Sequence, residues 1–439
     1  MTTDFRLRVD RNEAAPPLPT VLLDWFAGGG GSTIHAGDAL TKGLVTPEPA
    51  LDFLRLAAAV YCADRRTVRP GTWTRSLRVD IPVRDASRWH AVADDLGDTL
   101  SFLSGDEWWI DVRPSSEPEA DPWSPPDDVV DAVCLFSGGL DSFTGAVDLL
   151  AAGRRVCLVS HYESGKAPGA QRVLAQRLRE HYGEDRVILR RLFLRPAPIE
   201  AGQFRHLPAD RESSTRSRSL LFLASGLAVA AGYGPDIPLF IPENGFIGIN
   251  VPLTAARSGS FSTRTTHPYF MARLGDCVSR LGLSNPIVNP FRLMTKGEIL
   301  AATADGSAIR RFAGATISCS HPEASRFPKR PQGNCGYCFP CLIRRAAMYH
   351  VGLDDPAEYA FDALREHDEL SGERGSDLRA LIRSLDHEPT ASDVLRNGPV
   401  APAEIGSFAG VYERGRREIL AWMRAMNPSN HVRRQLPGA

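Results

Sequence analysis

Short apolar runs alternate with helical patterns through the middle of the chain. Residues 129–136 form an almost wholly apolar run, which is typical of a strand covered on both faces of a sheet. Further candidate strands are 156–160, 187–194 and 239–241. Helical patterns lie between them, at 143–152, 170–182 and 217–231. Strands that alternate with helices predict a doubly wound α/β fold around a parallel sheet.

The regions before and after this core have different patterns. Residues 51–61 are typical of a buried helix, and apolar positions at 77–83 and 108–112 alternate with polar ones as in half-buried strands. A linker rich in proline, serine and acidic residues follows at 114–128. Beyond residue 354 the chain is charged and helical, with helical patterns at 378–385 and 414–423. The glycine run at 28–31 has no lysine after it, and we interpret it as a surface loop.

These patterns divide 439 residues into four parts, as the length alone suggests for a multidomain chain. The predicted parts are an α+β accessory domain over 1–127, a doubly wound α/β core over 128–315, a cysteine-containing segment over 316–350 and a helical extension over 351–439. The accessory domain holds six of the seven tryptophans, and we expect it to frame the substrate entrance or to dock a partner.

Charge and hydropathy narrow the classes of partner. The 51 basic and 52 acidic residues nearly cancel, so no global field attracts nucleic acid. No apolar run approaches the roughly 20 residues that span a bilayer, and residues 1–10 lack the apolar segment of a signal peptide. We therefore expect a cytoplasmic protein with neither a membrane nor a nucleic-acid partner.

A small polar turn lies between the first core strand and the helix after it. It is made of Ser137, Gly138, Gly139, Leu140, Asp141 and Ser142. Glycines let a backbone approach a polyphosphate closely, and amides at a helix N-terminus point toward the anion. The serines add hydroxyl donors, while Asp141 is expected on the Mg²⁺ side of the phosphates or as a helix cap. The string lacks the Gly-Lys-Ser/Thr ending of a Walker A loop, and a plain capped turn is the alternative interpretation.

Four of the eight cysteines fall within 23 residues. Cys335, Cys338 and Cys341 form two overlapping C-x-x-C pairs, and Cys319 precedes them by sixteen positions. Four thiolates in this grouping suit a closed tetrahedral zinc site, which serves folding rather than catalysis. An iron–sulfur cluster competes, because spacing alone does not separate the two, and His321 is an alternative ligand to Cys319.

The turn at 137–142 resembles the signature of the PP-loop ATP pyrophosphatases, which hold the pyrophosphate part of ATP with it. The resemblance implies attack on the α-phosphorus of ATP and an AMP-activated intermediate that a nucleophile displaces. A carboxylate is a poor electrophile, and an AMP leaving group removes that barrier. Lys296 falls at a predicted helix start, where its charge opposes the helix dipole. We therefore expect it to contact phosphate and, with Asp141, to act in catalysis.

The turn and the cysteines together resemble the 7-cyano-7-deazaguanine synthase (QueC) family over roughly residues 129–350. Matching elements are Arg218 with the Ser-Leu-Leu-Phe-Leu run after it, Thr-Lys-Gly-Glu-Ile at 295–299 and Leu-Ile-Arg-Arg at 342–345. The resemblance implies a ligase that forms a carbon–nitrogen bond on a 7-carboxy-7-deazaguanine-like substrate, with ammonia giving an amide and a second activation giving the nitrile. It also implies that Arg218 lies at the nucleotide.

The segment 241–268 departs from that enzyme and is similar to the QueC-like proteins of bacterial anti-phage systems, the Qat system in particular. That similarity implies a co-encoded partner protein as acceptor of the activated group. The segment follows the fourth candidate strand, at the edge where doubly wound folds bind ligands. Candidate substrate-binding residues are Glu243, Asn244, Asn250, Arg257, Arg264 and His267. For each of them a solvated loop position is the alternative.

Two other functions stay open at this point. One is a tRNA-modifying PP-loop enzyme, against which the balanced charge weighs. The other is a nucleotide-sensing scaffold of a defence complex with little turnover. Release of AMP and pyrophosphate separates this scaffold from the enzymes.

Overall fold

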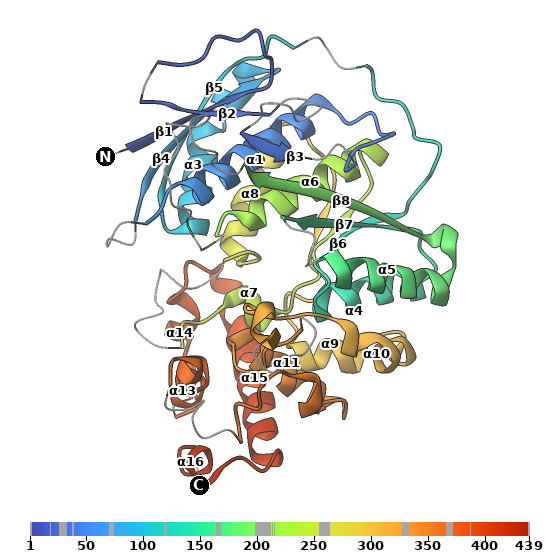
Figure 1. The fold of residues 1–439 in the computed structure, drawn as a ribbon, viewed down its shortest axis with the longest axis vertical. Coiled ribbons are helices and arrows are strands. Elements are labelled where there is room, and N and C mark those ends of the chain that lie inside the picture. The colour runs from blue at the N-terminus through green and yellow to red at the C-terminus, as the bar shows by residue number, and fades with distance from the viewer. Residues whose placement is uncertain are drawn as a thin grey trace.

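Two sheets form the framework of the chain (Figure 1). The computed structural model describes residues 2–17, 19–25, 33–36, 39–69, 74–117, 121–163, 168–197, 212, 214, 216–253, 264–326, 333–365, 372–386 and 388–437. The glycine run at 28–31 and Arg257 lie outside the described residues.

The first sheet has four parallel strands in the order β2-β1-β4-β5. They are β1 (Thr2–Arg8), β2 (Val21–Asp24), β4 (Ser76–Val83) and β5 (Glu107–Pro114). The helices of this part are α1 (Glu48–Arg66), α2 (Ala86–His90) and α3 (Ala93–Ser104). The predicted helix at 51–61 and the strands at 77–83 and 108–112 are confirmed.

The second sheet has the order β10-β9-β6-β7-β8-β3. Its strands are β6 (Ala132–Leu135), β7 (Val156–Tyr162), β8 (Val187–Pro196), β9 (Leu239–Phe240), β10 (Ile287–Val288) and β3 (Ile34–Ala36). All pair in parallel except β3, which runs antiparallel to β8. The helices between the strands are α4 (Leu140–Ala151), α5 (Pro168–Tyr182), α6 (Arg218–Tyr233), α7 (Gly245–Ile249) and α8 (Pro268–Arg280). The prediction of a parallel α/β sheet is confirmed.

From residue 296 onward the described chain is helical and lies at the end of the molecule away from the four-stranded sheet (Figure 1). Its helices are α9 (Lys296–Ala302), α10 (Gly306–Phe312), α11 (Phe339–His350), α13 (Ser376–Ser384), α14 (Ala391–Leu395), α15 (Ile405–Ala425) and α16 (Asn430–Arg433). Short 3₁₀ turns occur at Glu184–Arg186, Ala313–Ala315, Pro322–Arg326, Pro356–Glu358, Glu373–Gly375 and Pro402–Glu404. Side chains of α11, α13, α14 and α15 share a core around the fully buried Trp422.

The first 127 residues share a core with the rest of the chain. Strand β3 extends the six-stranded sheet along β8, and α1 packs against α6. Buried side chains of the first sheet, α1 and α6 form one continuous apolar cluster. The boundaries at 127, 315 and 350 stay predictions, but cutting the chain at 127 would expose the apolar face of α6 to water.

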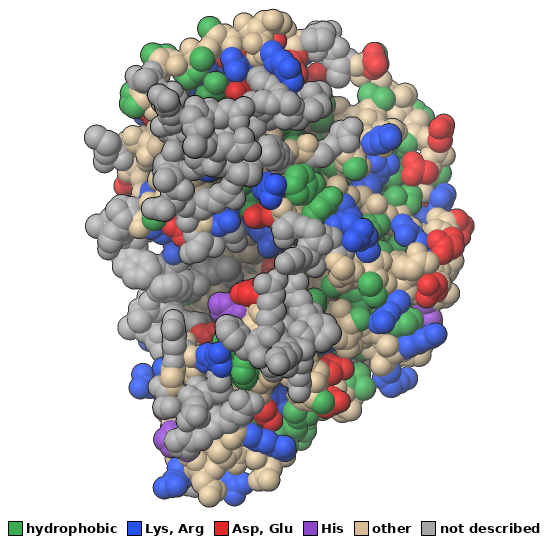
Figure 2. All heavy atoms as spheres, viewed as in Figure 1, with side chains coloured by type: hydrophobic (Ala, Val, Ile, Leu, Met, Phe, Trp, Pro, Cys, Tyr) green, Lys and Arg blue, Asp and Glu red, His purple; other side chains and the backbone are tan. Residues whose placement is uncertain are grey.

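Among the described residues, no helix is both long and apolar enough to cross a bilayer. On the face drawn in Figure 2, basic and acidic side chains are interspersed over the coloured atoms.

Candidate active site

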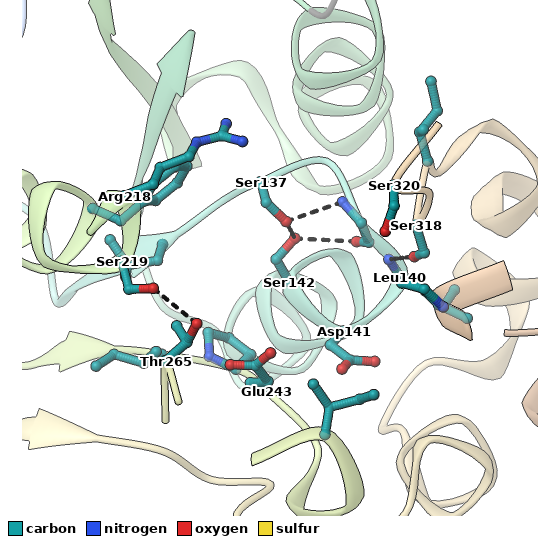
Figure 3. Close-up of a pocket in the computed structure, with 18 of the residues that line it drawn as sticks. Ser137, Leu140, Asp141, Ser142, Arg218, Ser219, Glu243, Thr265, Ser318 and Ser320 are labelled. Atoms are coloured by element: carbon teal, nitrogen blue, oxygen red, sulfur yellow. Dashed lines mark hydrogen bonds between the residues drawn. The ribbon is translucent and has the colours of Figure 1, made fainter. Parts of the chain in front are cut away.

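The site lies where the order of the strands reverses. From β6 the chain proceeds to β7 and β8 on one side, then returns to β9 on the other side of β6. The loops after β6 and β9 therefore separate at the carboxyl edge of the sheet and leave a crevice, where doubly wound folds bind ligands. A cavity of about 440 Å³ occupies this position, a volume typical of ligand sites (Figure 3). Ser137, Gly139, Leu140, Asp141 and Ser142 line it.

The loop after β6 has the conformation that a phosphate cradle requires. Gly138 has φ +84°, a left-handed conformation that glycine adopts without steric cost. The Ser137 Oγ atom lies 3.1 Å from Ser142 Oγ and accepts a hydrogen bond from the Gly139 amide at 3.2 Å. Helix α4 begins directly afterwards, so the positive end of its dipole faces the cavity. The hydroxyls and the first helical turn therefore meet on one wall (Figure 3).

Asp141 joins two distant segments below this loop. The Nζ atom of Lys296, the first residue of α9, lies 2.5 Å from Asp141 Oδ1. The Asn244 side-chain amide donates to Asp141 Oδ2 at 2.6 Å. The helix cap is Gly139, so the expected capping role of Asp141 is wrong, because both of its oxygens are turned to Lys296 and Asn244 instead. A carboxylate held from both sides fixes the ammonium of Lys296 at the cavity wall, and its contact with phosphate stays a prediction.

Glu243 is the second acidic side chain of the cavity, and it follows β9 directly. The Thr266 hydroxyl donates to its Oε2 atom at 2.9 Å. Removal from water raises the pKa of Glu243 to about 7; the nearby Asp141 also raises it, whereas the Thr266 hydrogen bond and Lys296 lower it. This carboxyl group therefore changes its charge near neutral pH, unlike an ordinary glutamate.

The start of α6 forms the opposite wall. Arg218 lines the cavity, lies over the Phe222 ring at 5.3 Å and donates to His161 Nδ1 at 3.4 Å. The Nδ1 atom must then carry a lone pair, so His161 Nε2 carries the proton that it donates to the Leu194 carbonyl at 2.9 Å. Burial and the charge of Arg218 lower the pKa of His161 to about 3. His161 is therefore a neutral anchor for the guanidinium of Arg218.

The remaining substrate candidates lie away from the lining of the cavity. Asn244 is fully buried behind Asp141, and its Oδ1 atom accepts from the Ile247 amide at 2.9 Å. His267 caps α8 and packs on Phe102 with ring centroids 5.1 Å apart. Arg264 donates to the Phe102 carbonyl at 2.6 Å, and Asn250 ends α7 in a left-handed conformation with φ +43°. These side chains hold the segment after β9 in place, and Glu243 alone of the described candidates lines the cavity.

Several cavity residues had no recognised signal in the sequence. Ser318 Oγ accepts a hydrogen bond from the Leu140 amide at 3.0 Å, and the Ile317 amide donates to the Gly138 carbonyl at 2.9 Å. The cysteine segment (residues 316–350) thus lies directly over the loop at 137–142, which we call the phosphate loop. Other lining residues that sequence reasoning missed are Ser219, Thr265, Ser320 and Pro340. Ser318 and Ser320 flank Cys319, but nothing local indicates that Ser318 contacts Leu140, 178 positions earlier.

The four predicted cysteines converge in this segment. The ligand atoms of Cys319, Cys335, Cys338 and Cys341 all lie within 4.8 Å of one another. The Sγ atoms of Cys319 and Cys338 are 3.9 Å apart, and those of Cys335 and Cys341 are 3.8 Å apart. Zn–S bonds of about 2.3 Å in a tetrahedron place sulfurs about 3.8 Å apart, so the observed spacing fits one ion.

The backbone around the cysteines supports thiolates. The amides of Cys335 and His321 donate to Cys319 Sγ at 3.2 and 3.3 Å. Gly336 has φ +90°, and a Cβ atom there would lie 2.0 Å from the Phe361 carbonyl oxygen, so this tight turn requires glycine. The His321 ring stacks on Tyr337 and is not part of the cluster.

The distances between the cysteine sulfurs also favour a single zinc ion over an iron–sulfur cube. An iron–sulfur cube places iron and sulfide between its thiolates, which holds them farther apart than a single ion does. The four-cysteine cluster is therefore compatible with one tetrahedral zinc, as predicted, and a closed set of four thiolates leaves no open position for catalysis.

Two carboxylates from outside the core, the buried Asp64 and the half-buried Glu418, hold the helices that carry cavity residues. Asp64 of α1 accepts from the Ser217 amide at 3.1 Å and from its hydroxyl at 2.7 Å, directly before Arg218. Glu418 of α15 accepts from the Thr295 hydroxyl and from the Gly297 amide at 3.2 Å, on both sides of Lys296. Acceptors at helix N-termini satisfy amides that the helix leaves unbonded. The N-terminal and C-terminal parts thus each position one wall of the cavity.

We expect Glu418→Ala to raise the KM for ATP and to lower kcat, because Lys296 loses the support of the first turn of α9. A buried donor left without its acceptor costs about 1–3 kcal/mol. Glu418→Gln keeps one carbonyl acceptor and should recover part of the loss. The matched control on the same helix is Arg414→Ala, which removes a partly exposed ion pair with Glu298 worth about 1 kcal/mol or less. Steady-state AMP release measures both constants, and equal values for Glu418→Ala and Arg414→Ala would contradict this role.

A strand–loop–helix phosphate cradle at the reversal point of a parallel sheet is consistent with the PP-loop class of nucleotide-binding folds. Comparison with curated proteins gives 7-cyano-7-deazaguanine synthases. That of Chromohalobacter salexigens is 30% identical over 249 residues, which cover 54% of this chain and 88% of the relative. That of Syntrophobacter fumaroxidans is 27% identical over 250 residues, 53% of this chain and 97% of the relative. That of Leptospira interrogans is 25% identical over 240 residues, 51% of this chain and 88% of the relative.

The chain therefore belongs to the 7-cyano-7-deazaguanine synthase family. The match leaves nearly half of this chain without a counterpart in those relatives. No protein-family model and no solved structure gives a significant match.

Proposed function

We propose that the chain adenylates the carboxylate of a 7-carboxy-7-deazaguanine-like substrate with ATP and then transfers the acyl group to a nitrogen nucleophile. The observation that carries this proposal is the meeting of the phosphate loop, Lys296 and Glu243 in one cavity. The loop and lysine suit a nucleotide, and the carboxyl group suits a partner with N–H donors or positive charge. The name of the relatives supports the substrate class.

The proposed reaction requires two activations. The substrate carboxylate attacks the α-phosphorus of ATP, so that a carbon-bound oxygen joins AMP and pyrophosphate leaves. Ammonia then attacks the acyl carbon, a carbon–nitrogen bond forms, and AMP leaves with the oxygen to give an amide. A second ATP activates the amide oxygen in the same way, and loss of AMP and a proton gives the nitrile.

The residues of the cavity supply binding and charge for these steps. The loop hydroxyls and first-turn amides of α4 would bind the pyrophosphate part of ATP, and the Lys296 ammonium would stabilise negative charge on the phosphates. Mg²⁺ would enter with ATP as the phosphate counterion. Arg218 would lie against the nucleotide from the opposite wall. The zinc would hold the cysteine segment, and with it Ser318, over the loop.

The proposal is tested by mixing the full chain with ATP, Mg²⁺, the deazaguanine acid and ammonium. We expect AMP and pyrophosphate release that depends on the acid, and a product whose mass is that of the amide or the nitrile. Omitting the acid is the control. ATP binding without release of AMP would indicate a nucleotide-sensing scaffold, and release that depends on tRNA would indicate a tRNA-modifying enzyme. Either result would overturn the proposed activity.

The proposal extends to anti-phage defence through the similarity of segment 241–268 to the QueC-like proteins of such systems. In that setting an amine of a co-encoded protein would take the place of ammonia. Mass spectrometry of the co-encoded protein after incubation with ATP and the acid tests this extension. A covalent increase by the acyl mass is expected, and an unmodified partner beside ammonia-dependent product would confine the activity to the small molecule.

A further inference from the structure

We propose that Glu243 is the proton acceptor that converts a bound ammonium ion into the ammonia that attacks the acyl-adenylate. This inference rests on the proposed function and adds to it the origin of the nucleophile. Ammonium has no lone pair, so an enzyme that takes its nitrogen from ammonium at neutral pH must remove a proton before the carbon–nitrogen bond forms.

The geometry presents one oxygen of Glu243 to the cavity. Thr266 holds Oε2 at 2.9 Å, and among the described residues no hydrogen bond reaches Oε1. The backbone is fixed as well, because Asn289 Nδ2 donates to the Glu243 carbonyl at 3.0 Å. In Figure 3 the carboxyl group lies between Thr265 and Asp141 and faces the same space as the phosphate loop. A side chain held this way is aligned to accept a proton rather than to pair within the protein.

The charges around Glu243 favour a small cation. The charged groups nearest to it are Asp141 from α4 and Lys296 from α9, which form an ion pair with each other, while Arg216 and Arg218 line the same cavity beside the start of α6. With both carboxyl groups ionised, the three side chains carry a net charge of −1. One ammonium ion beside Glu243 would neutralise the charge of these three side chains, where water screens it weakly. A neutral base pocket would gain no such interaction with the cation.

Ammonium gives one proton to Glu243 Oε1, and the resulting ammonia attacks the acyl carbon through its lone pair. The carbon–nitrogen bond forms while the bond to the AMP oxygen breaks, and AMP takes that electron pair. The second nitrogen proton leaves with the AMP phosphate, and Glu243 returns its proton to solvent. A carboxyl group with a pKa of about 7 can both accept and release this proton near neutral pH.

The pH dependence follows from the ionised fraction of Glu243. The base works when deprotonated, so at fixed total ammonium the wild-type rate should rise up to about pH 7 and then level off. A variant without the base depends on free ammonia, whose fraction grows about tenfold for each pH unit below the pKa of ammonium. Its rate should therefore continue to rise from pH 7 to 8 where that of the wild type is flat.

The decisive variant is Glu243→Gln, which keeps the size of the side chain and an acceptor for Thr266. We expect amide formation from ammonium to fall about 100-fold at pH 7. Hydroxylamine is largely neutral at pH 7 and needs no base, so hydroxamate formation should stay within about threefold of the wild-type rate. Glu184→Gln, at a side chain that is 70% exposed, is the matched control and should behave as wild type with both nucleophiles.

The Thr266→Val variant tests the assignment independently, through the pKa of Glu243. Without the hydroxyl that stabilises the carboxylate, the pKa of Glu243 should rise further, and the midpoint of the ammonium-dependent rate should move to higher pH. The assignment would be overturned if Glu243→Gln lost activity with both ammonium and hydroxylamine. It would also be overturned if this variant formed the amide from ammonium at the wild-type rate. Absence of acid-dependent AMP release in the wild type, with hydroxylamine present, would instead contradict the proposed function itself.

Discussion

Replacing Lys296 by methionine is expected to lower AMP release at least 100-fold. Its ammonium lies at the cavity wall, 2.5 Å from Asp141 Oδ1 and beside the phosphate loop. A preorganised positive group at charge that develops in the transition state is typically worth about 10²–10³ in rate. Asp141→Asn and Ser137→Ala should reduce turnover for the same reason, since Asp141 holds the lysine and Ser137 shapes the loop. Single-turnover AMP formation with saturating ATP measures the effect.

Stability must be measured beside activity, because the ion pair is buried. From the sequence, Asp141→Ala would cost only the roughly 1 kcal/mol of a lost helix cap. The structure corrects this value: Lys296 is 7% exposed, and removing its partner leaves an uncompensated charge that costs about 3–5 kcal/mol. Asp141→Ala combined with Lys296→Met should recover part of that loss in urea unfolding but none of the activity. Near-normal AMP release by the folded single variants would remove the loop and its lysine from the mechanism.

Replacing Cys338 by serine is expected to remove the metal and to unfold the segment around it. Closed zinc sites contribute about 10–16 kcal/mol in isolated peptides, which equals or exceeds the stability of a typical domain. ATP binding should be lost with the metal, because Ser318 and Cys319 form one wall of the cavity. Elemental analysis should find one zinc per wild-type chain and none in the variant, with a lower Tm.

The control for the metal is Cys277→Ala, a buried thiol in α8 that is not part of the cluster. It should keep one zinc per chain. A soluble Cys338→Ser protein that cleaves ATP at the wild-type rate, or iron in place of zinc in the wild type, would contradict the prediction.

Local sequence patterns were enough to predict the parts of the site whose residues are consecutive or nearly so in the sequence. The phosphate loop could be predicted because strand, turn and helix are consecutive and each has its own periodicity. The cysteine knuckle at 335–341 could be predicted for the same reason, since the C-x-x-C spacing reflects the geometry of one ion. Lys296 was singled out by an unfavourable charge at a helix start; in the structure this charge is paired with the Asp141 carboxylate, and its contact with phosphate stays a prediction.

Contacts between segments that are distant in the sequence could not be predicted from such local patterns. Asn244 and His267 are polar residues after a core strand, which fits a substrate contact equally well, yet they cap α7 and α8. Nothing near Asp64 or Glu418 distinguishes them from surface acids, although both accept hydrogen bonds at the helix starts of the core. A side chain reveals such a role only through its partner, and the partners lie more than 100 positions away in the sequence.

The sequence by itself therefore determined the parallel α/β core, the loop at 137–142, the cysteine grouping and the family, because each strand, helix, turn and C-x-x-C pair is encoded by residues that are close in sequence. The tertiary structure decided what surrounds the loop. It brought Glu243, Lys296 and Ser318 from three separate segments to one cavity, and it turned the N-terminal and C-terminal parts into supports for α6 and α9. The physical reason is that burial selects these contacts: a carboxylate or an amide removed from water must find a partner, and only the packed chain supplies it.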